Sequence, residues 1–117
     1  MPDIVVTVPK TFGLAEWIAE GDAAGDQYSG ALWDFSTGGA TPNIKPGERV
    51  YVVCHDRVRG YAPLVEWRRL DDFRLVFTRG WGAVAVTVPW VVKGFRGWRY
   101  RFWKLDEEIP FPEWRKP

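Results

Sequence analysis

The chain has 117 residues, of which 46% are hydrophobic and 16% aromatic, and its formal net charge at pH 7 is +1. This amount of apolar surface excludes an intrinsically disordered chain, and the length is typical of one domain, so we predict a single domain over residues 1–117. No apolar run approaches the roughly 20 residues of a membrane-spanning helix, and no secretory leader is visible. The single cysteine, Cys54, excludes an internal disulfide and fits a reducing compartment. We therefore expect a cytoplasmic protein that binds no membrane.

The first third of the sequence predicts a strand, a helix and a second strand. The β-branched run DIVVTVP, residues 3–9, is typical of a strand that ends at a proline. In residues 11–20, apolar side chains recur at the spacing of an amphipathic helix, with Trp17 on the core face. The segment GALWDFSTGG, residues 30–39, predicts a short strand with Trp33, followed by a surface loop.

From residue 49 onward the pattern is that of successive β-strands. The runs RVYVVCH and RVRGYAPLVEW flank a short turn at Asp56 and predict a hairpin. Further strands are predicted from FRLVFT, AVAVTVP and WRYRFW, at residues 73–78, 83–89 and 98–103. About six or seven short strands with one clear helix predict a mainly β fold with one or two short helices (α+β), arranged as a small, mostly antiparallel barrel.

The last predicted strand has one aromatic face and one mainly basic face, because side chains alternate along a strand. The aromatic face, predicted as core, consists of Trp98, Tyr100 and Phe102, and the basic face, predicted as a contact surface, of Arg99, Arg101 and Trp103. Residues 90–105 include five basic side chains, Arg96 among them, and no acidic one. Basic and aromatic residues interleaved in this way suit single-stranded nucleic acid, which offers phosphates to the cations and bases to the rings.

Tryptophans outside the predicted core are the candidates for stacking on a base. Those predicted as core are Trp17, Trp67 and Trp98, and those at strand ends, in turns or on the basic face are Trp33, Trp81, Trp90, Trp103 and Trp114. Of the second group we choose Trp33 and Trp90. Arg57 and Arg59 flank Val58 and share a strand face, which adds two cations on another strand.

Patterns for catalysis and metal binding are sparse. One histidine and one cysteine are too few for a zinc site, and we expect no metal and no cofactor. Cys54 and His55 are neighbours in a predicted strand, so their side chains point in opposite directions and form no dyad. His55 is either a polar residue at a strand end or a hydrogen-bond donor near a ligand. The segment STGGATPN, residues 36–43, lacks the spacing of a phosphate-binding P-loop.

The segments PGERVYVVCHDRVRGYAPL and WGAVAVTVP resemble the PUA-like superfamily of small β-barrels, which includes PUA, ASCH, EVE, YTH and SRA domains. In those folds a hydrophobic-Pro-Gly-acidic-Arg-Val turn opens a strand that pairs with a following Arg-hydrophobic-x-Gly-hydrophobic strand, as IKPGERVYVV and DRVRGYAPL do here. The resemblance extends over about residues 28–103. It implies a β-pseudobarrel that binds RNA, or a modified or flipped-out base, in a cleft of aromatic and polar residues. Trp33 and the STGG loop would then stand at the mouth of the cleft, with Arg57 and Arg59 near it.

Three functions remain open from the sequence. The first is a module that binds nucleic acid (RNA or modified DNA) or a modified nucleobase without catalysis. Its predicted contact residues are Trp33, Ser36, Thr37, Arg57, Arg59, Trp90, Arg96, Arg99 and Arg101. The second is a small hydrolase acting on a modified nucleoside, suggested by the acetylcytidine amidohydrolases of the ASCH group, with Thr37, Lys45 and Glu48 as candidates. The third is a homodimeric protein-interaction module whose exposed aromatic side chains form one patch.

Overall fold

The computed structural model describes residues 3–7, 33–37, 41–70, 75–79, 84 and 86–110. The predicted helix at residues 11–20, with Trp17, lies outside the described residues, as do Trp81 and Trp114. The elements in chain order are β1 (Ile4–Thr7), β2 (Trp33–Thr37), β3 (Arg49–Cys54), β4 (Arg57–Arg69), β5 (Leu75–Arg79), β6 (Val86–Thr87), β7 (Trp98–Tyr100), the 3-10 turn η1 (Leu105–Glu107) and β8 (Ile109–Pro110).

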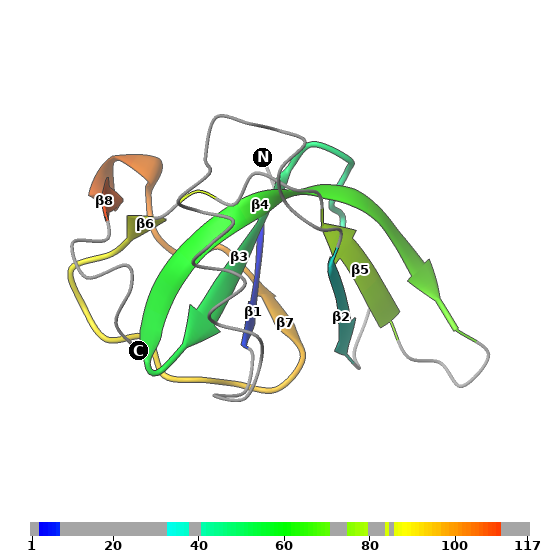
Figure 1. Cartoon of the computed structure of the whole chain (residues 1–117), viewed down its shortest axis with the longest axis horizontal. Helices are drawn as coiled ribbons and strands as arrows, with labels where there is room; N and C mark the ends of the chain where they lie inside the picture. The colour runs from blue at the N-terminus through cyan, green and yellow to red at the C-terminus, as the bar shows by residue number, and fades with distance from the viewer. Residues whose placement is uncertain are drawn as a thin grey trace.

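Six of the strands form one curled sheet in the order β2-β5-β4-β3-β1-β7, and β6 pairs separately with β8. The pairing of β1 with β3 is parallel, and the other pairings are antiparallel. The long strand β4 arches across the molecule, pairing with β3 through its first half and with β5 through its second half (Figure 1). Register shifts interrupt both pairings, and such irregularities bend a strand. The predicted fold class, a mainly β and mostly antiparallel barrel-like fold, is confirmed.

The centre of the sheet is buried on both faces, which explains the uninterrupted apolar runs in β1 and β3. One buried cluster comprises Ile4, Val6, Ile44, Val50, Val52, Cys54, Ala62, Leu64, Leu75 and Phe77. We call this the first cluster. The second cluster, on the opposite face of the sheet, comprises Val5, Tyr51, Val53, Val58, Val88, Val92 and Trp103. Successive residues of β1 and β3 therefore alternate between the two clusters. The second cluster also includes residues from the 86–110 segment, so this segment covers one face of the sheet.

The β3–β4 hairpin closes through a two-residue turn, as the sequence predicts. His55 and Asp56 both have positive φ angles, 55° and 58°. Two successive residues in the left-handed region match the twist of antiparallel strands, and aspartate tolerates this conformation better than most residues. The turn fixes the register in which Cys54 pairs with Arg57.

The last strand is shorter than the sequence predicts, and its faces are assigned differently. Trp98 packs against the first cluster, but Tyr100 and Phe102 are 44% and 54% exposed, whereas Trp103 is only 4% exposed. Strand pairing ends at Tyr100, so the alternation of faces ends there as well, and Trp103 enters the second cluster. The predictions of Tyr100 and Phe102 as core and of Trp103 as surface are therefore wrong.

Trp67 is a second incorrect core prediction, because its side chain is 37% exposed. It lies in the second half of β4, beyond the register shift, where the strand pairs with β5 and the residues from Val65 to Arg69 are all exposed. Trp67 is therefore a surface residue, and it lies far along β4 from the β3–β4 turn.

Candidate nucleic-acid interface

The connection between β6 and β7 crosses the end of the sheet that contains the β3–β4 turn (Figure 1). It is fastened at several points. Val88 and Val92 are buried in the second cluster, and the Val92 N–H donates to the Asp56 carbonyl over 2.9 Å. Further along, the Phe95 N–H donates to Thr7 Oγ1 over 3.1 Å. These contacts hold the whole connection against the ends of β1 and β3.

Gly94 allows this connection to approach β1 closely. A Cβ atom at position 94 would stand 2.9 Å from Thr7 Cγ2, closer than side chains tolerate. The absence of a side chain thus allows the close approach that lets the next residue, Phe95, hydrogen-bond to Thr7.

The residues between these fastening points face outward. Trp90 is 37% exposed and Val91 is 59% exposed, while Lys93 and Arg96 are also on the surface. We call the surface formed by the β3–β4 turn, the 88–97 connection and Arg99 the basic end. Its four cations are Arg57, Lys93, Arg96 and Arg99, and the acidic residue described within it is Asp56.

Two of these cations are held by contacts that orient their guanidinium groups. Arg57 is half-buried and donates through Nη2 to the Val88 carbonyl over 3.4 Å, so β4 is joined to the connection two residues before Trp90. The guanidinium of Arg99 lies 4.4 Å from the centre of the Phe95 ring, a cation–π arrangement. The structure therefore brings together Arg57, Trp90, Arg96 and Arg99 of the predicted site.

Two other predicted contact arginines are not on this surface. Arg59 is 2% exposed, and its Nε donates to the Cys54 carbonyl over 3.2 Å. Burial lowers the pKa of its guanidinium. Arg101 forms an ion pair with Asp3, with Nε 3.2 Å from Oδ2, and it also donates to the Trp103 carbonyl. Both arginines are used inside the fold.

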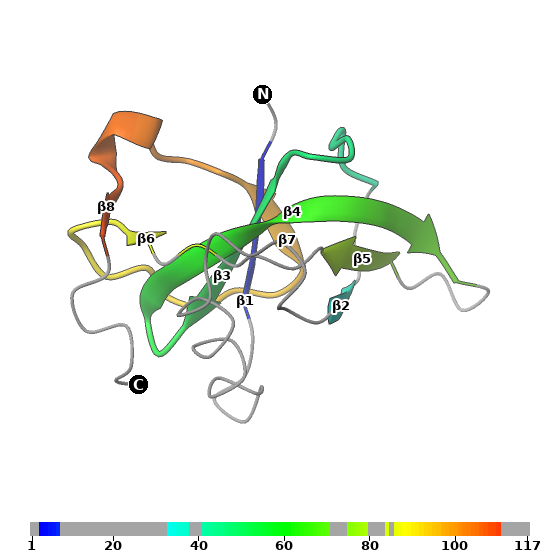
Figure 2. The same cartoon turned by 45° about the horizontal axis from the view of Figure 1, so that its top comes forward.

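The predicted residues Trp33, Ser36 and Thr37 lie in β2, at the opposite side of the sheet from β7. Trp33 pairs with Arg79 of β5, which pairs in turn with Leu64 of β4. Leu64 is seven residues along β4 from Arg57, a distance of about 23 Å at the rise of a β-strand. In both views β2 is far from the turn that precedes Arg57 (Figures 1 and 2). The sheet therefore does not bring Trp33 and Arg57 into one site.

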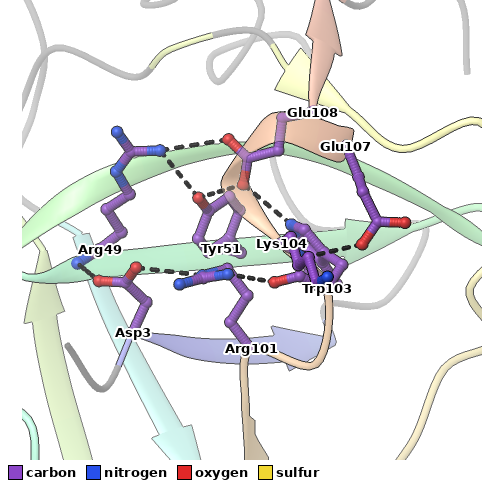
Figure 3. Close-up of polar contacts among 8 residues, drawn as sticks. All are labelled: Asp3, Arg49, Tyr51, Arg101, Trp103, Lys104, Glu107 and Glu108. Atoms are coloured by element: carbon purple, nitrogen blue, oxygen red, sulfur yellow. Dashed lines mark hydrogen bonds and ion pairs between the residues drawn. The ribbon is translucent and has the colours of Figure 1, made fainter.

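A cluster of polar side chains, which the sequence did not reveal, surrounds the carboxylate of Glu108 (Figure 3). Glu108 Oε2 accepts hydrogen bonds from the Tyr51 hydroxyl and, over 2.9 Å, from Trp103 Nε1. Its Oε1 accepts from Arg49 Nη1 over 3.2 Å. The same nitrogen donates to the Tyr51 hydroxyl over 2.9 Å, and the guanidinium lies 4.1 Å from the centre of the Tyr61 ring.

The ionisation of this cluster follows from its burial. Desolvation, followed by the hydrogen bond to Glu108, raises the pKa of Tyr51 well above its usual value, so its hydroxyl stays protonated as a donor. Burial acts to lower the pKa of Arg49, but the hydrogen bond to Tyr51 and the nearby Glu108 charge outweigh it and raise this pKa. Each Glu108 oxygen already accepts a hydrogen bond, so the carboxylate is used within the fold.

Asp3 extends this network to the first strand. Its Oδ1 accepts from the Arg49 backbone N–H over 2.8 Å, while its Oδ2 accepts from Arg101. The partners are 46 and 98 residues away in the sequence, so no local motif marks them.

Two of the residues considered for hydrolysis, Lys45 and Glu48, form a turn of the fold. Glu48 is buried, and its Oε1 accepts from the Lys45 N–H over 2.8 Å, while the Glu48 N–H donates back to the Lys45 carbonyl over 3.0 Å. These two bonds close the turn before β3, and the Lys45 side chain is exposed. Within the described residues, no group of three or more His, Cys, Asp or Glu side chains is arranged to hold a metal ion.

Comparison of the chain with protein families, with curated proteins and with solved structures finds no match. In the described part of the chain, no helix is both long and apolar enough to cross a membrane. The candidate interface is therefore described from the residues of this chain alone.

Proposed function

We propose that this protein binds single-stranded nucleic acid, with RNA as the first candidate, or an exposed modified base, through the basic end. The observation that supports this most directly is Trp90, an exposed indole between two buried valines, in the connection that also carries Lys93 and Arg96 and that Arg57 contacts at Val88. The burial of Val88 and Val92 holds the chain on both sides of Trp90, and more than a third of the Trp90 surface is left exposed. Such a ring offers a base a stacking platform with little loss of conformational entropy.

The chemistry of the surface supports a single strand as the ligand. Stacking of one base on an aromatic side chain contributes about 1–3 kcal/mol, and it requires a base whose face is free. The faces of bases in a duplex are covered by their neighbours, whereas those of a single strand can be reached. Arg57, Lys93, Arg96 and Arg99 would neutralise phosphates beside the stacked base. The curled, mostly antiparallel sheet also supports the proposal that the fold is related to the PUA-like barrels.

The test is a titration of a fluorescently labelled single-stranded RNA of mixed sequence, followed by anisotropy, with the Trp90→Ala variant. Trp67→Ala is the matched control, because both tryptophans are 37% exposed but Trp67 lies on the second half of β4. We expect a loss of affinity of about fivefold to 150-fold for Trp90→Ala, and none for Trp67→Ala. Equal losses in the two variants, or no binding by the wild-type protein, would refute the proposal.

The second part of the test measures how RNA binding depends on salt and compares the RNA strand with a free modified nucleoside. If all four cations meet phosphates, the logarithm of the binding constant falls with the logarithm of salt concentration with a slope of about −2.8, from about 0.7 per contact on a single strand. A free modified nucleoside that binds as tightly as the strand, without salt dependence, would restrict the function to base recognition.

A further inference from the structure

We infer that Glu108 is a positioning residue for the basic end: its carboxylate fastens the chain around Trp103 and β8, and this in turn fixes Trp90. The inference rests on the proposed function for what Trp90 does, but the positioning itself concerns only this protein. Glu108 lies in the segment after Trp103, five residues along the chain, and its carboxylate is hydrogen-bonded to the Trp103 indole, which is part of the second cluster (Figure 3).

The first connection between the two sites is packing. The indole N–H of Trp103 donates to Glu108 Oε2, which fixes the orientation of the ring. That ring is buried in the second cluster together with Val88 and Val92. These two valines bracket Trp90 in the sequence and are the reason that the segment between them faces outward. A change in the orientation of the Trp103 ring would therefore alter the packing of Val88 and Val92, the two residues that hold the chain on either side of Trp90.

The second connection is strand pairing. Ile109 and Pro110, which directly follow Glu108, form β8 and pair with Thr87 and Val86 of β6. Figures 1 and 2 both show β6 and β8 together, on the other side of β4 from β5 and β2. Pairing of only two residues on each strand gives little stability by itself, so it depends on what holds β8 in place. Glu108 provides this hold from the neighbouring position.

A carboxylate at position 108 can accept from every donor that the cluster presents to it. Donors from Tyr51 and Trp103 converge on one oxygen, and Arg49 approaches the other. A glutamine has only one acceptor oxygen, and its NH2 group would face a donor in either orientation. The exchange keeps the size of the side chain but turns the NH2 group either toward the buried donors Tyr51 and Trp103 or toward Arg49, so the cluster loses at least one of its hydrogen bonds.

The experiment places 5-fluorotryptophan in the full chain and follows the ¹⁹F spectrum without ligand. The Trp90 and Trp67 resonances are assigned by their loss in Trp90→Phe and Trp67→Phe. We expect Glu108→Gln to shift or broaden the Trp90 resonance and to leave that of Trp67 unchanged. The matched control is Glu107→Gln, because Glu107 is exposed and, among the described residues, accepts only from the nearby Lys104 N–H, over 2.8 Å. This control should change neither resonance.

Affinity for the labelled RNA is the second readout. We expect Glu108→Gln to weaken binding severalfold, by less than Trp90→Ala, while Glu107→Gln binds as the wild type does. A role limited to stability would lower the unfolding midpoint and leave the Trp90 resonance of the folded protein unchanged, and that result would overturn the inference. A shifted Trp90 resonance in a protein that binds no nucleic acid would instead refute the proposed function and retain the positioning.

Trp103→Phe provides a milder variant if Glu108→Gln does not fold. It removes one donor to Glu108 and keeps an aromatic ring in the second cluster. We expect the same change at the Trp90 resonance, with a smaller amplitude. An unchanged Trp90 resonance in folded Trp103→Phe would contradict the packing connection.

Discussion

Arginine and aromatic side chains occur together in two regions of this molecule, and the two regions use them in opposite ways. Around Glu108, the guanidinium of Arg49, the hydroxyl of Tyr51 and the indole of Trp103 all meet a carboxylate. At the basic end, Trp90 is exposed, and four cations are accompanied in the described residues by one acidic side chain, that of Asp56. The groups of the first region are used within the fold, and the second is the surface that we propose for nucleic acid.

The two regions differ in the position of the carboxylates, and not in the density of arginines and rings. Arg99 and Arg101 make this point on one short segment. Arg101 is paired with Asp3 at 3.2 Å, whereas Arg99 is exposed and lies over the Phe95 ring. The two residues have the same chemistry and differ in what the fold places beside them.

The largest expected effect is on stability, at the Glu108 cluster. Removing the carboxylate leaves Arg49 and two buried donors without their acceptor, so we expect Glu108→Ala to lower the free energy of unfolding by about 3 kcal/mol. Glu107→Ala, at an exposed position, should change it by less than about 0.5 kcal/mol. Urea denaturation of the two variants measures both values. Similar losses for the two glutamates would contradict the structural role of the cluster.

The next largest effect is on RNA binding, and it is expected at the basic end. Trp90→Ala should weaken RNA binding by about 1–3 kcal/mol, the contribution of one stacked base, while its free energy of unfolding changes by less than about 1 kcal/mol, because the ring is partly exposed. Anisotropy titration and urea denaturation of the same sample give both quantities. A large loss of stability with unchanged affinity would make Trp90 part of the fold and would remove the contrast between the two regions.

Most strands could be predicted from the sequence, because their burial leaves a local pattern. The apolar runs of β1 and β3, and the turn at Asp56, predict the strands and the hairpin that the structure confirms. The end of β7 could not be predicted in this way. Alternation assigns Trp103 to the surface only if the strand continues, and pairing with β1 stops at Tyr100.

The structure separates the residues of the candidate site by their surroundings, which the sequence does not show. Trp90, Arg96 and Arg99 were recognised by residue type, and the structure places them at one end of the sheet. Arg59 and Arg101 have the same residue type, but their partners, a carbonyl and a carboxylate, are set by folding. Glu108 was missed because it stands in a short acidic run near the end of the chain, where nothing local distinguishes it from Glu107.

Alkaline pH provides a smaller and more selective probe of the Glu108 cluster. We expect Tyr51→Phe to lower the free energy of unfolding at pH 7 by about 1.5 kcal/mol, since a hydrogen bond to a charged group is lost. Burial raises the pKa of folded Tyr51 above that of an unfolded tyrosine, about 10. Above that pH the unfolded wild-type chain releases a proton that the folded chain keeps, so this contribution to stability declines as pH rises. The difference between wild type and Tyr51→Phe should therefore narrow above about pH 10 in urea titrations, and a constant difference would contradict the raised pKa.

The smallest effect distinguishes Arg99 from a cation elsewhere on the sheet. Replacing Arg99 with alanine should reduce the steepness of the salt dependence of RNA binding by about 0.7, the contribution of one phosphate contact on a single strand. Arg69 is the comparison residue, because it is also exposed but lies at the far end of β4, where it donates to Thr41 Oγ1 over 2.9 Å. Arg69→Ala should leave the slope unchanged. If both variants reduced the slope equally, the RNA would follow the overall charge of the surface, and the basic end would have no special part in binding.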